Sequence, residues 1–385
     1  MEWSNITITD MQTYFEPTPA VDNIVSLFFE AKDYKRTIKA AKKVLLFAKT
    51  DSDKFLGHFF IANSLSAMND IDKAASEALK ALKYCDNFNG SNNIVFWCYS
   101  FLARYYYVHK HMFKEAMEVL EKGRRFAGTN ENLYAYYINM ARLYGQCEDY
   151  QDAFEMAQSA LQYAESDVKI ADCYLQMAGS ECDLSEFDIE NHGQEAIKYS
   201  RLCLDYVEKS LSENKGNILS LRNMACLCYK TMCIIYEERG EKDKAIEEAN
   251  HALQYIDGDR EDEKEMHEII ARCYEDRKDG SAIKPLRMLL RYCDTDEERI
   301  DVHCRLASEY INIDDLEKEK KEYEVLIKLD PGESKFYACM LLSVYHEDGD
   351  IQSCKNLIIK YGLRKDEPGM EDYVKNDPEL KKYLK

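Results

Sequence analysis

Histidine pairs are the first residues in this sequence that could do chemistry, because imidazole binds metal ions. His109 and His111 flank an expected turn, and two histidines two positions apart in a loop can share a metal. A third ligand at a convincing spacing is missing from the sequence around them. We therefore interpret the pair as surface residues and predict no bound metal.

Cysteine is the second reactive type, with 14 residues spread singly through the chain. Cys226 and Cys228 lie on one expected helix, followed by Cys233, but the first two point to different sides and cannot chelate together. The neighbours His303 and Cys304 face different ways on a helix and lack an orienting acid, so they do not form a nucleophile–base pair. We interpret the cysteines as reduced packing residues, which indicates a cytoplasmic protein.

Sequence motifs for catalysis are also missing. The chain has no glycine-rich phosphate loop, no His-Glu-x-x-His helix and no paired catalytic carboxylates in a strand context. The sequence therefore predicts a protein that is not an enzyme and that needs no cofactor.

The net charge of the chain indicates which kinds of partner it can bind. The formal net charge is −20, from 71 acidic and 51 basic residues, and such a surface repels phosphate backbones and attracts basic partners. The first twenty residues lack the basic start and apolar core of a signal peptide. The longest apolar run, 44–48, is far shorter than the ~20 residues that span a bilayer. We expect no nucleic acid and no membrane as partner, and the oligomeric state stays open.

The elements that position these side chains are helices, and the stretch 232–253 shows their pattern. Apolar residues at helical spacing define a first helix, and a turn follows at 239–243. Gly240 supplies the backbone conformation that ends the first helix. Small residues then form one face of a second helix, namely Ala245, Ala249 and Ala252. One such pair cannot bury its apolar face alone, so the pattern has to recur.

The pattern recurs along most of the chain. The alanine that starts the second helix returns at Ala74, Ala116, Ala153, Ala196 and Ala245, with spacings of 42, 37, 43 and 49 residues. A two-helix repeat near this length is typical of a helical solenoid. We expect about nine pairs, at about 21–48, 54–84, 93–125, 131–163, 167–210, 217–256, 262–292, 296–329 and 334–361.

One pair carries a resemblance to a known family. Its residues are Tyr137, Met140, Ala141, Tyr144, Ala153, Ala157 and Ala160, and Asp330-Pro331 supplies the proline that often closes a repeat. This pattern resembles the tetratricopeptide repeat (TPR), although several pairs are longer than the family's unit. The resemblance covers about 21–361 and implies an all-α, right-handed α-solenoid. In such a fold the first helices line a concave groove that binds an extended peptide or a partner helix.

The resemblance also implies which side chains face the groove. Positions one or two steps from the packed small residue of each first helix are Asn63, Tyr105, Asn139, Arg142, Gln176, Lys230, Arg272 and Arg305. Asparagine and arginine can hold a peptide backbone or a carboxylate through fixed hydrogen bonds. The alternative is that these are ordinary polar residues on solvated helix faces. The family's full carboxylate clamp is not present.

Several segments stand outside the repeats. We expect an irregular arm at 1–20, whose Trp3, Tyr14 and Phe15 could cover the first pair or enter the groove. An enlarged acidic loop is predicted at 182–193, and an acidic run at 257–279 could dock a basic segment. The segment 362–385 should cap the array, with a last helix after Asn376-Asp377-Pro378.

Two functions are compatible with these features of the sequence. The first is a non-catalytic scaffold or adaptor that binds a protein or peptide partner along the groove. The alternative is a TPR regulator whose superhelix changes conformation when it binds a signalling peptide. Such regulators usually carry an N-terminal output domain, and the repeats here begin by about Val21, so the first function is favoured.

Overall fold

The computed structural model describes residues 23–384, and within this range every regular element is a helix. The arm predicted at 1–20, with Trp3, Tyr14 and Phe15, lies outside the described residues. The chain divides into two compact units, Met1–Gly216 and Asn217–Lys385. Each unit is described by itself.

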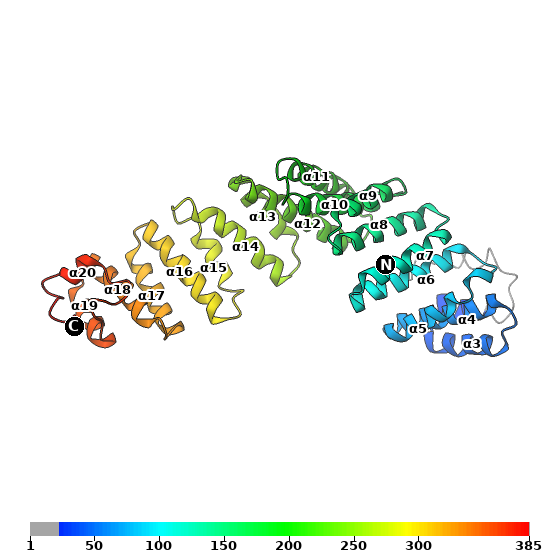
Figure 1. The fold of residues 1–385 in the computed structure, drawn as a ribbon, viewed down its shortest axis with the longest axis horizontal. Helices are drawn as coiled ribbons and strands as arrows, with labels where there is room; N and C mark the ends of the chain where they lie inside the picture. Colours follow the sequence, from blue (N-terminus) through cyan, green and yellow to red (C-terminus); the bar gives the residue numbers. More distant parts are fainter. Residues whose placement is uncertain (1–22, 385) are drawn as a thin grey trace. The chain divides into compact units, whose positions relative to one another are not determined.

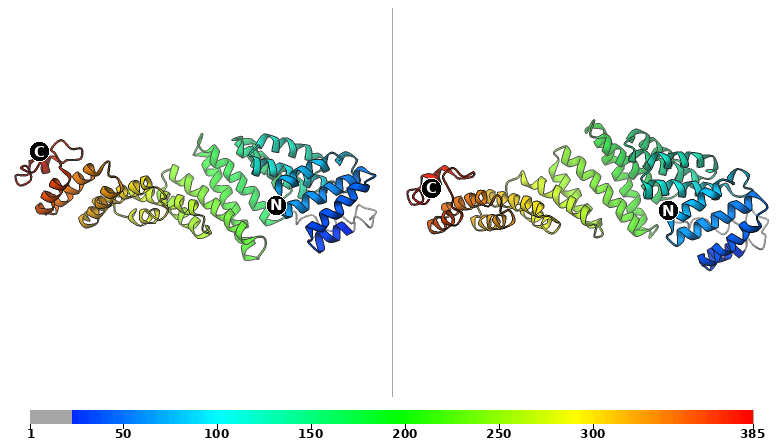
Figure 2. Two further views of the ribbon diagram at one scale, coloured as in Figure 1. Left: turned by 90° about the horizontal axis from the view of Figure 1, so that it is seen from below. Right: turned by 60° about the horizontal axis from the view of Figure 1, so that its bottom comes forward.

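Unit 1 is a series of antiparallel helical hairpins that follow one another in chain order (Figures 1 and 2). Each helix packs against the next, so the hairpins stack side by side. The elements are η2 (Ser26–Glu30), α3 (Tyr34–Phe47), α4 (Asp51–Ala67), α5 (Ile71–Leu82), η3 (Cys85–Asn87), α6 (Asn92–Arg104), η4 (Tyr105–His109), α7 (Phe113–Gly123), η5 (Arg124–Phe126), α8 (Asn130–Gln146), α9 (Tyr150–Leu161), α10 (Asp167–Leu184) and α11 (Asn191–Ser212).

Unit 2 repeats the same arrangement. Its elements are α12 (Ile218–Glu238), α13 (Lys242–Tyr255), α14 (Arg260–Glu275), α15 (Ile283–Leu289), α16 (Asp296–Asn312), α17 (Leu316–Leu329), α18 (Ser334–Glu347), α19 (Ile351–Tyr361) and α20 (Asp372–Asn376). The all-α class predicted from the sequence is confirmed. The number of repeats and the handedness of the superhelix stay predictions.

Most hairpins share one turn geometry. The first helix ends at a residue with positive φ, and the next residue caps the second helix. Gly240 has the predicted positive φ of 72°, but Asn69, Glu148 and Asp314 fill the equivalent place at 62°, 63° and 58°. The amide after each of them donates to a carbonyl five residues back, as from Glu241 to Tyr236 at 2.8 Å, so the last turn of the first helix stays hydrogen-bonded.

Alanines form the contact between the two helices of a hairpin, as their spacing predicted. Ala74 and Ala245 are fully buried, and so are Ala157, Ala249 and Ala252. A methyl side chain fills little space, so the two helix backbones approach closely and larger residues pack on either side. The hydrophobic clusters join consecutive helices, which means that each hairpin is stabilised mainly by its neighbours.

Two predicted segments differ in the structure. The loop expected at 182–193 is only Ser185–Glu190, because 182–184 continue α10 and 191–193 begin α11. The last helix expected after Pro378 is a series of hydrogen-bonded turns, in which Asp377 accepts from the amides of Glu379 and Leu380 at 2.7 and 3.1 Å. This segment still closes the last hairpin, since Leu380 and Leu384 are buried in the cluster of α18 and α19.

One helix is long and apolar enough to span a membrane by length and composition. This is α12, and 44% of its most apolar 18-residue stretch is buried inside the structure. The helix packs against α13 and α14, and a buried core helix passes the same test. We therefore treat α12 as part of the core of unit 2.

Candidate functional site

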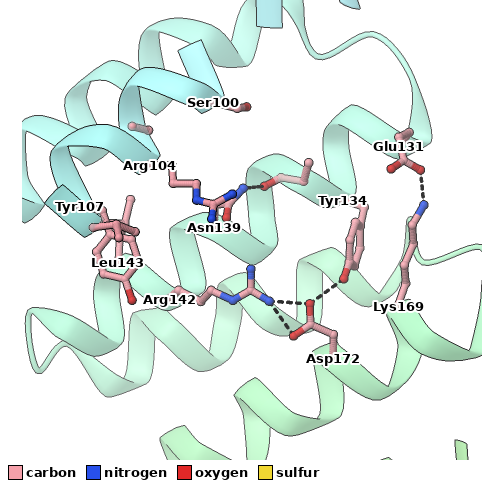
Figure 3. A pocket seen from close by; sticks show the side chains of 13 residues that line it. Ser100, Arg104, Tyr107, Glu131, Tyr134, Asn139, Arg142, Leu143, Lys169 and Asp172 are labelled. Carbon is pink, nitrogen blue, oxygen red and sulfur yellow. Dashed lines mark hydrogen bonds and ion pairs between the residues drawn. The ribbon is translucent and has the colours of Figure 1, made fainter. Parts of the chain in front are cut away.

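A pocket of about 460 Å³ opens on unit 1 across three consecutive first helices (Figure 3). Its lining comes from α6, η4, α8 and α10, while the second helices α7 and α9 contribute nothing to it. Apolar side chains form part of the wall, namely Ala103, Tyr107, Val108, Ala135 and Leu143. The resemblance implied that first helices form the binding face, and this pocket lies on such a face.

The centre of the pocket is a polar network around Asp172 on α10. Nη2 of Arg142 donates to both carboxylate oxygens of Asp172, at 2.7 and 2.6 Å, and the Tyr134 hydroxyl donates to one of them at 2.8 Å (Figure 3). Burial raises the pKa of Tyr134, and Asp172 beside it acts in the same direction. These bonds fix the guanidinium of Arg142 between α8 and α10.

Arg142 keeps donors for a ligand. The two bonds to Asp172 use Nη2 alone, and Nε and Nη1 have no hydrogen-bond partner among residues 23–384. The side chain lines the pocket and is about one-third exposed. A fixed arginine with spare N–H groups can bind a carboxylate or a main-chain carbonyl without losing much side-chain entropy.

The remaining lining residues contribute charged side chains and one hydroxyl group without a hydrogen-bond partner among the described residues. Lys169 on α10 pairs with Glu131 on α8, and Arg104 stands on α6. The lining therefore carries three cations and two carboxylates, which is a local excess of one positive charge in a chain of −20. The buried hydroxyl of Ser100 has no hydrogen-bond partner in the part of the chain that the structure describes.

The structure brings three of the predicted groove residues together. Asn139 and Arg142 line the pocket. The side-chain amide of Gln176 donates to the carboxylate of Asp172, at 3.4 Å. The Asn139 amide also donates to the carbonyl of Ala135 at 2.7 Å, which fixes its orientation.

Two others lie elsewhere. Asn63 is only 2% exposed and donates to the carbonyl of Phe59, so a partner cannot reach it in this structure. Tyr105 lies in the π-helical turn η4 and donates to Asp72 on α5 at 2.7 Å. Asn63 and Tyr105 therefore do not line the pocket that contains Arg142, because Asn63 is buried and the Tyr105 hydroxyl contacts Asp72.

In unit 2 the predicted cations join successive first helices. Lys230 on α12 contacts Asp262 at 2.5 Å, and Arg272 on α14 reaches back to Glu237 on α12 at 2.9 Å. Arg305 on α16 contacts carboxylates of α14, namely Glu275 at 2.7 Å and Glu268 at 2.9 Å. Partner binding by Lys230, Arg272 and Arg305 stays a prediction.

Sequence reasoning missed the carboxylates that bind these cations. The signal was present, because the partners stand about one repeat apart: 30 residues for Arg142 and Asp172, 32 for Lys230 and Asp262, and 35 for Arg272 and Glu237. Opposite charges at the repeat spacing identify ion pairs between neighbouring first helices. Searching for them would have found Asp172.

The acidic run 257–279 is largely used inside unit 2. Six of its carboxylates bind a cation or a tyrosine hydroxyl from outside the run: Asp262, Glu263, Glu265, Glu268, Glu275 and Asp276. This leaves fewer carboxylates for a basic segment of a partner than the sequence suggested.

The cysteine and histidine side chains that could do chemistry make packing and ion-pair contacts in the part of the chain that the structure describes. Burial raises the pKa of the Cys226 thiol to about 11, and Cys228 and Cys233 are buried as well. Burial also raises the pKa of Cys304, while His303 points to Glu322, at 2.6 Å. A thiolate nucleophile is disfavoured at these positions. No group of three metal-binding side chains occurs within 23–384, so His109 and His111 gain no third ligand there.

No protein-family model and no curated protein matches this sequence. Among solved structures, the apo form of RapI is 15% identical, with 89% of this chain and 99% of RapI covered at a TM-score of 0.51. A tetratricopeptide repeat protein from Parabacteroides merdae is 12% identical, covering 72% of this chain and 93% of that chain at 0.42.

A signal transduction ATPase with a tetratricopeptide repeat sensor from Pyrococcus horikoshii is 16% identical, covering 88% of this chain and 54% of that chain at a TM-score of 0.47. At such identities a likeness shows the fold alone. The fold is a TPR-like α-solenoid, in agreement with the resemblance seen in the sequence.

Proposed function

We propose that this chain is a non-catalytic scaffold that binds a segment of a partner polypeptide across α6, α8 and α10. TPR-like folds support a role in protein interaction at this coarse level. The observation that carries the proposal is the arrangement of Arg142. Asp172 fixes its guanidinium, and the remaining N–H groups are available to a pocket of about 460 Å³. The pocket offers donors for a carboxylate or a peptide carbonyl and an apolar wall for one side chain.

The chemistry of the pocket favours a neutral or acidic segment over a basic one. Three cations line the pocket against two carboxylates, and both carboxylates already bind cations of the chain. We further propose a reducing, cytoplasmic compartment, because most of the cysteines are buried as small apolar residues.

Site-specific photo-crosslinking tests the proposal. A photo-reactive amino acid replaces Val108, which lies on the pocket rim and is 42% exposed, and the matched control replaces exposed Gln158 on α9. We expect a discrete polypeptide adduct from Val108 in living cells and none from Gln158. Arg142→Lys keeps the charge but loses the planar fork, and it should reduce the adduct several-fold.

Two outcomes would contradict this. Equal adducts from both positions would mean that the pocket is not the binding face, and an adduct that survives Arg142→Lys unchanged would remove Arg142 from recognition. The peptide-sensing alternative predicts another result: a short peptide, and not a folded partner, would change the solution-scattering profile of the chain.

A further inference from the structure

The outer face of α3 is strongly positive. Its 14 residues include five cations and no carboxylate, namely Lys35, Arg36, Lys39, Lys42 and Lys43, and all five are exposed. Their spacing places them along one side of the helix. The opposite side, with Thr37 and Ala41 fully buried, packs against η2 and α4.

These cations are not neutralised by the part of the chain that the structure describes. Arg36 pairs with Asp33 at 3.3 Å, while Lys35, Lys39, Lys42 and Lys43 have no ion pair within 23–384. In the next hairpin, by contrast, Lys73 forms an ion pair with Asp70 at 2.6 Å. Like charges four residues apart on a helix destabilise it by a few tenths of a kcal/mol per pair, so this face carries a cost.

Two apolar side chains extend the basic face. Leu46 and Phe47 at the end of α3 are 76% and 75% exposed. We name the surface made by Lys35, Arg36, Lys39, Lys42, Lys43, Leu46 and Phe47 the α3 face. Large apolar groups held in water beside a row of charges are typical of contact surfaces.

A complementary surface exists at the α10–α11 turn of the same unit. The ten residues 181–190 contain five carboxylates and neither lysine nor arginine. Phe187, at 81%, stands exposed between exposed Glu186 and Asp188. Phe187, Leu46 and Phe47 are the three most exposed large apolar residues within 23–384. Partial burial and the charge of Glu186 raise the pKa of Asp183, as expected where cations are lacking.

The two surfaces cannot meet within one copy of unit 1. The hairpins α4–α5, α6–α7 and α8–α9 stack between α3 and the α10–α11 turn (Figure 1). A second copy has no such restriction. We propose that the α3 face docks onto the α10–α11 turn of a second copy of this chain, with lysines against carboxylates and Phe47 and Leu46 beside Phe187.

The contact joins two different surfaces, so it is head-to-tail and leaves one surface of each kind free at the ends of any assembly that does not close into a ring. One helix face on one turn buries less than the ~1,200 Å² of a standard stable interface, so the association is weak. Charge supplies much of the attraction, and salt at about 0.5 M should suppress it. Nucleic acid is disfavoured as the occupant of the α3 face, because an extended anionic surface would be repelled by the remaining negative charge of the chain.

Sedimentation velocity of the full chain over a range of concentrations tests the proposal. The face variant is K39Q/K43Q/F47S, and the turn variant is E186Q/F187S/D188N; all six side chains are exposed, so both variants should fold. The control is K114Q/K122Q, which removes two exposed lysines of α7. We expect mass-dependent association of the wild type and the control at low salt, weakened at least about tenfold in each variant.

Mixing the two variants gives the decisive result. The turn variant keeps an intact α3 face and the face variant keeps an intact turn, so the mixture should form dimers that grow no further. A wild type that stays monomeric at low salt overturns the proposal. Association lost in the face variant but kept in the turn variant also overturns it, since the α3 face would then bind another acidic segment, such as residues 1–22 with four carboxylates and no Lys or Arg.

Discussion

At the scale of single residues, charged side chains on the first helices hold the hairpins together and also form the candidate site. Arg142 joins α8 to α10 through Asp172, and Lys230 joins α12 to α14 through Asp262. An ion pair that is partly buried keeps its geometry better than an exposed one. The side chains proposed for recognition are therefore oriented by the same contacts that stack the hairpins.

Glu319 on α17 should make the stability of unit 2 depend on pH. Its side chain is buried, with 6% exposure, and burial, followed by the charges of Glu347 and Asp314, raises its pKa to about 7. In the unfolded chain a glutamate has its ordinary pKa near 4.5. Folding therefore takes up a proton between these two values, and the stabilisation from the protonated form is lost as the pH rises through about 7.

Glu319→Gln removes this penalty. We expect the variant to be more stable than the wild type by about 1–3 kcal/mol above neutral pH, and the difference to vanish in mild acid. Urea unfolding at a series of pH values measures the free energy. The control is Glu297→Gln, at an exposed site on α16, which should leave the pH dependence unchanged. A variant less stable than the wild type at alkaline pH would show that the carboxylate is needed.

At the scale of helices and hairpins, close packing depends on a few small residues. Gly123 near the end of α7 lies against Tyr99 on α6, and a Cβ built on it would stand 2.6 Å from the Cβ of Tyr99. Gly123→Ala should force the two helices apart and cost about 1–3 kcal/mol of unfolding free energy. Thermal and urea unfolding measure the loss.

Gly179 in α10 is the matched control. A Cβ there meets no atom within 4 Å, so Gly179→Ala should stabilise the helix by up to about 1 kcal/mol. If both substitutions had the same sign, helix propensity would decide the effect and the α6–α7 contact would not.

The helices and their buried faces could be predicted because both depend on neighbours a few residues away. The spacing of Ala245 and Ala249 and the turn at Gly240 are local signals, and the structure confirms them. The predicted loop at 182–193 is too long, because 182–184 contain neither glycine nor proline and continue α10, and 191–193 begin α11.

The site was only partly predictable because it depends on how successive hairpins stack. The family resemblance pointed to Asn139 and Arg142, which line the pocket, and their binding role stays a prediction. The resemblance could not show that Asn63 would be buried, nor that Asp172, one repeat away, would bind Arg142. Such contacts follow from the offset between neighbouring hairpins, which no single repeat encodes.

At the scale of the whole molecule, the chain combines a large negative charge with local exceptions. The net charge is −20, yet α3 is strongly basic and the pocket has a small positive excess. Many carboxylates bind cations of the neighbouring hairpin instead of facing a partner. Net charge alone therefore indicates a basic partner, whereas the two candidate binding surfaces favour carboxylates.

The division into two compact units predicts how far the destabilising effect of a substitution extends along the chain. Contacts run from each helix to its neighbours, so a local defect should weaken adjacent hairpins and fade with distance. Ala141 in α8 and Ala249 in α13 are buried alanines, one in each unit; Ala141 lies on the first helix of its hairpin and Ala249 on the second. Replacing either with leucine overpacks a hairpin and should cost about 1–3 kcal/mol.

Hydrogen exchange resolves where this cost falls. Ala141→Leu should lower amide protection in α8–α10 and leave α16–α19 as in the wild type, and Ala249→Leu should lower it in α12–α14 and spare α4–α6. The two variants serve as controls for each other, since both replace a buried alanine with leucine and they lie in different units. An equal loss along residues 23–384 in both variants would show that the chain unfolds as one cooperative body. Two separate patterns would show that each unit can lose local structure without destabilising the other.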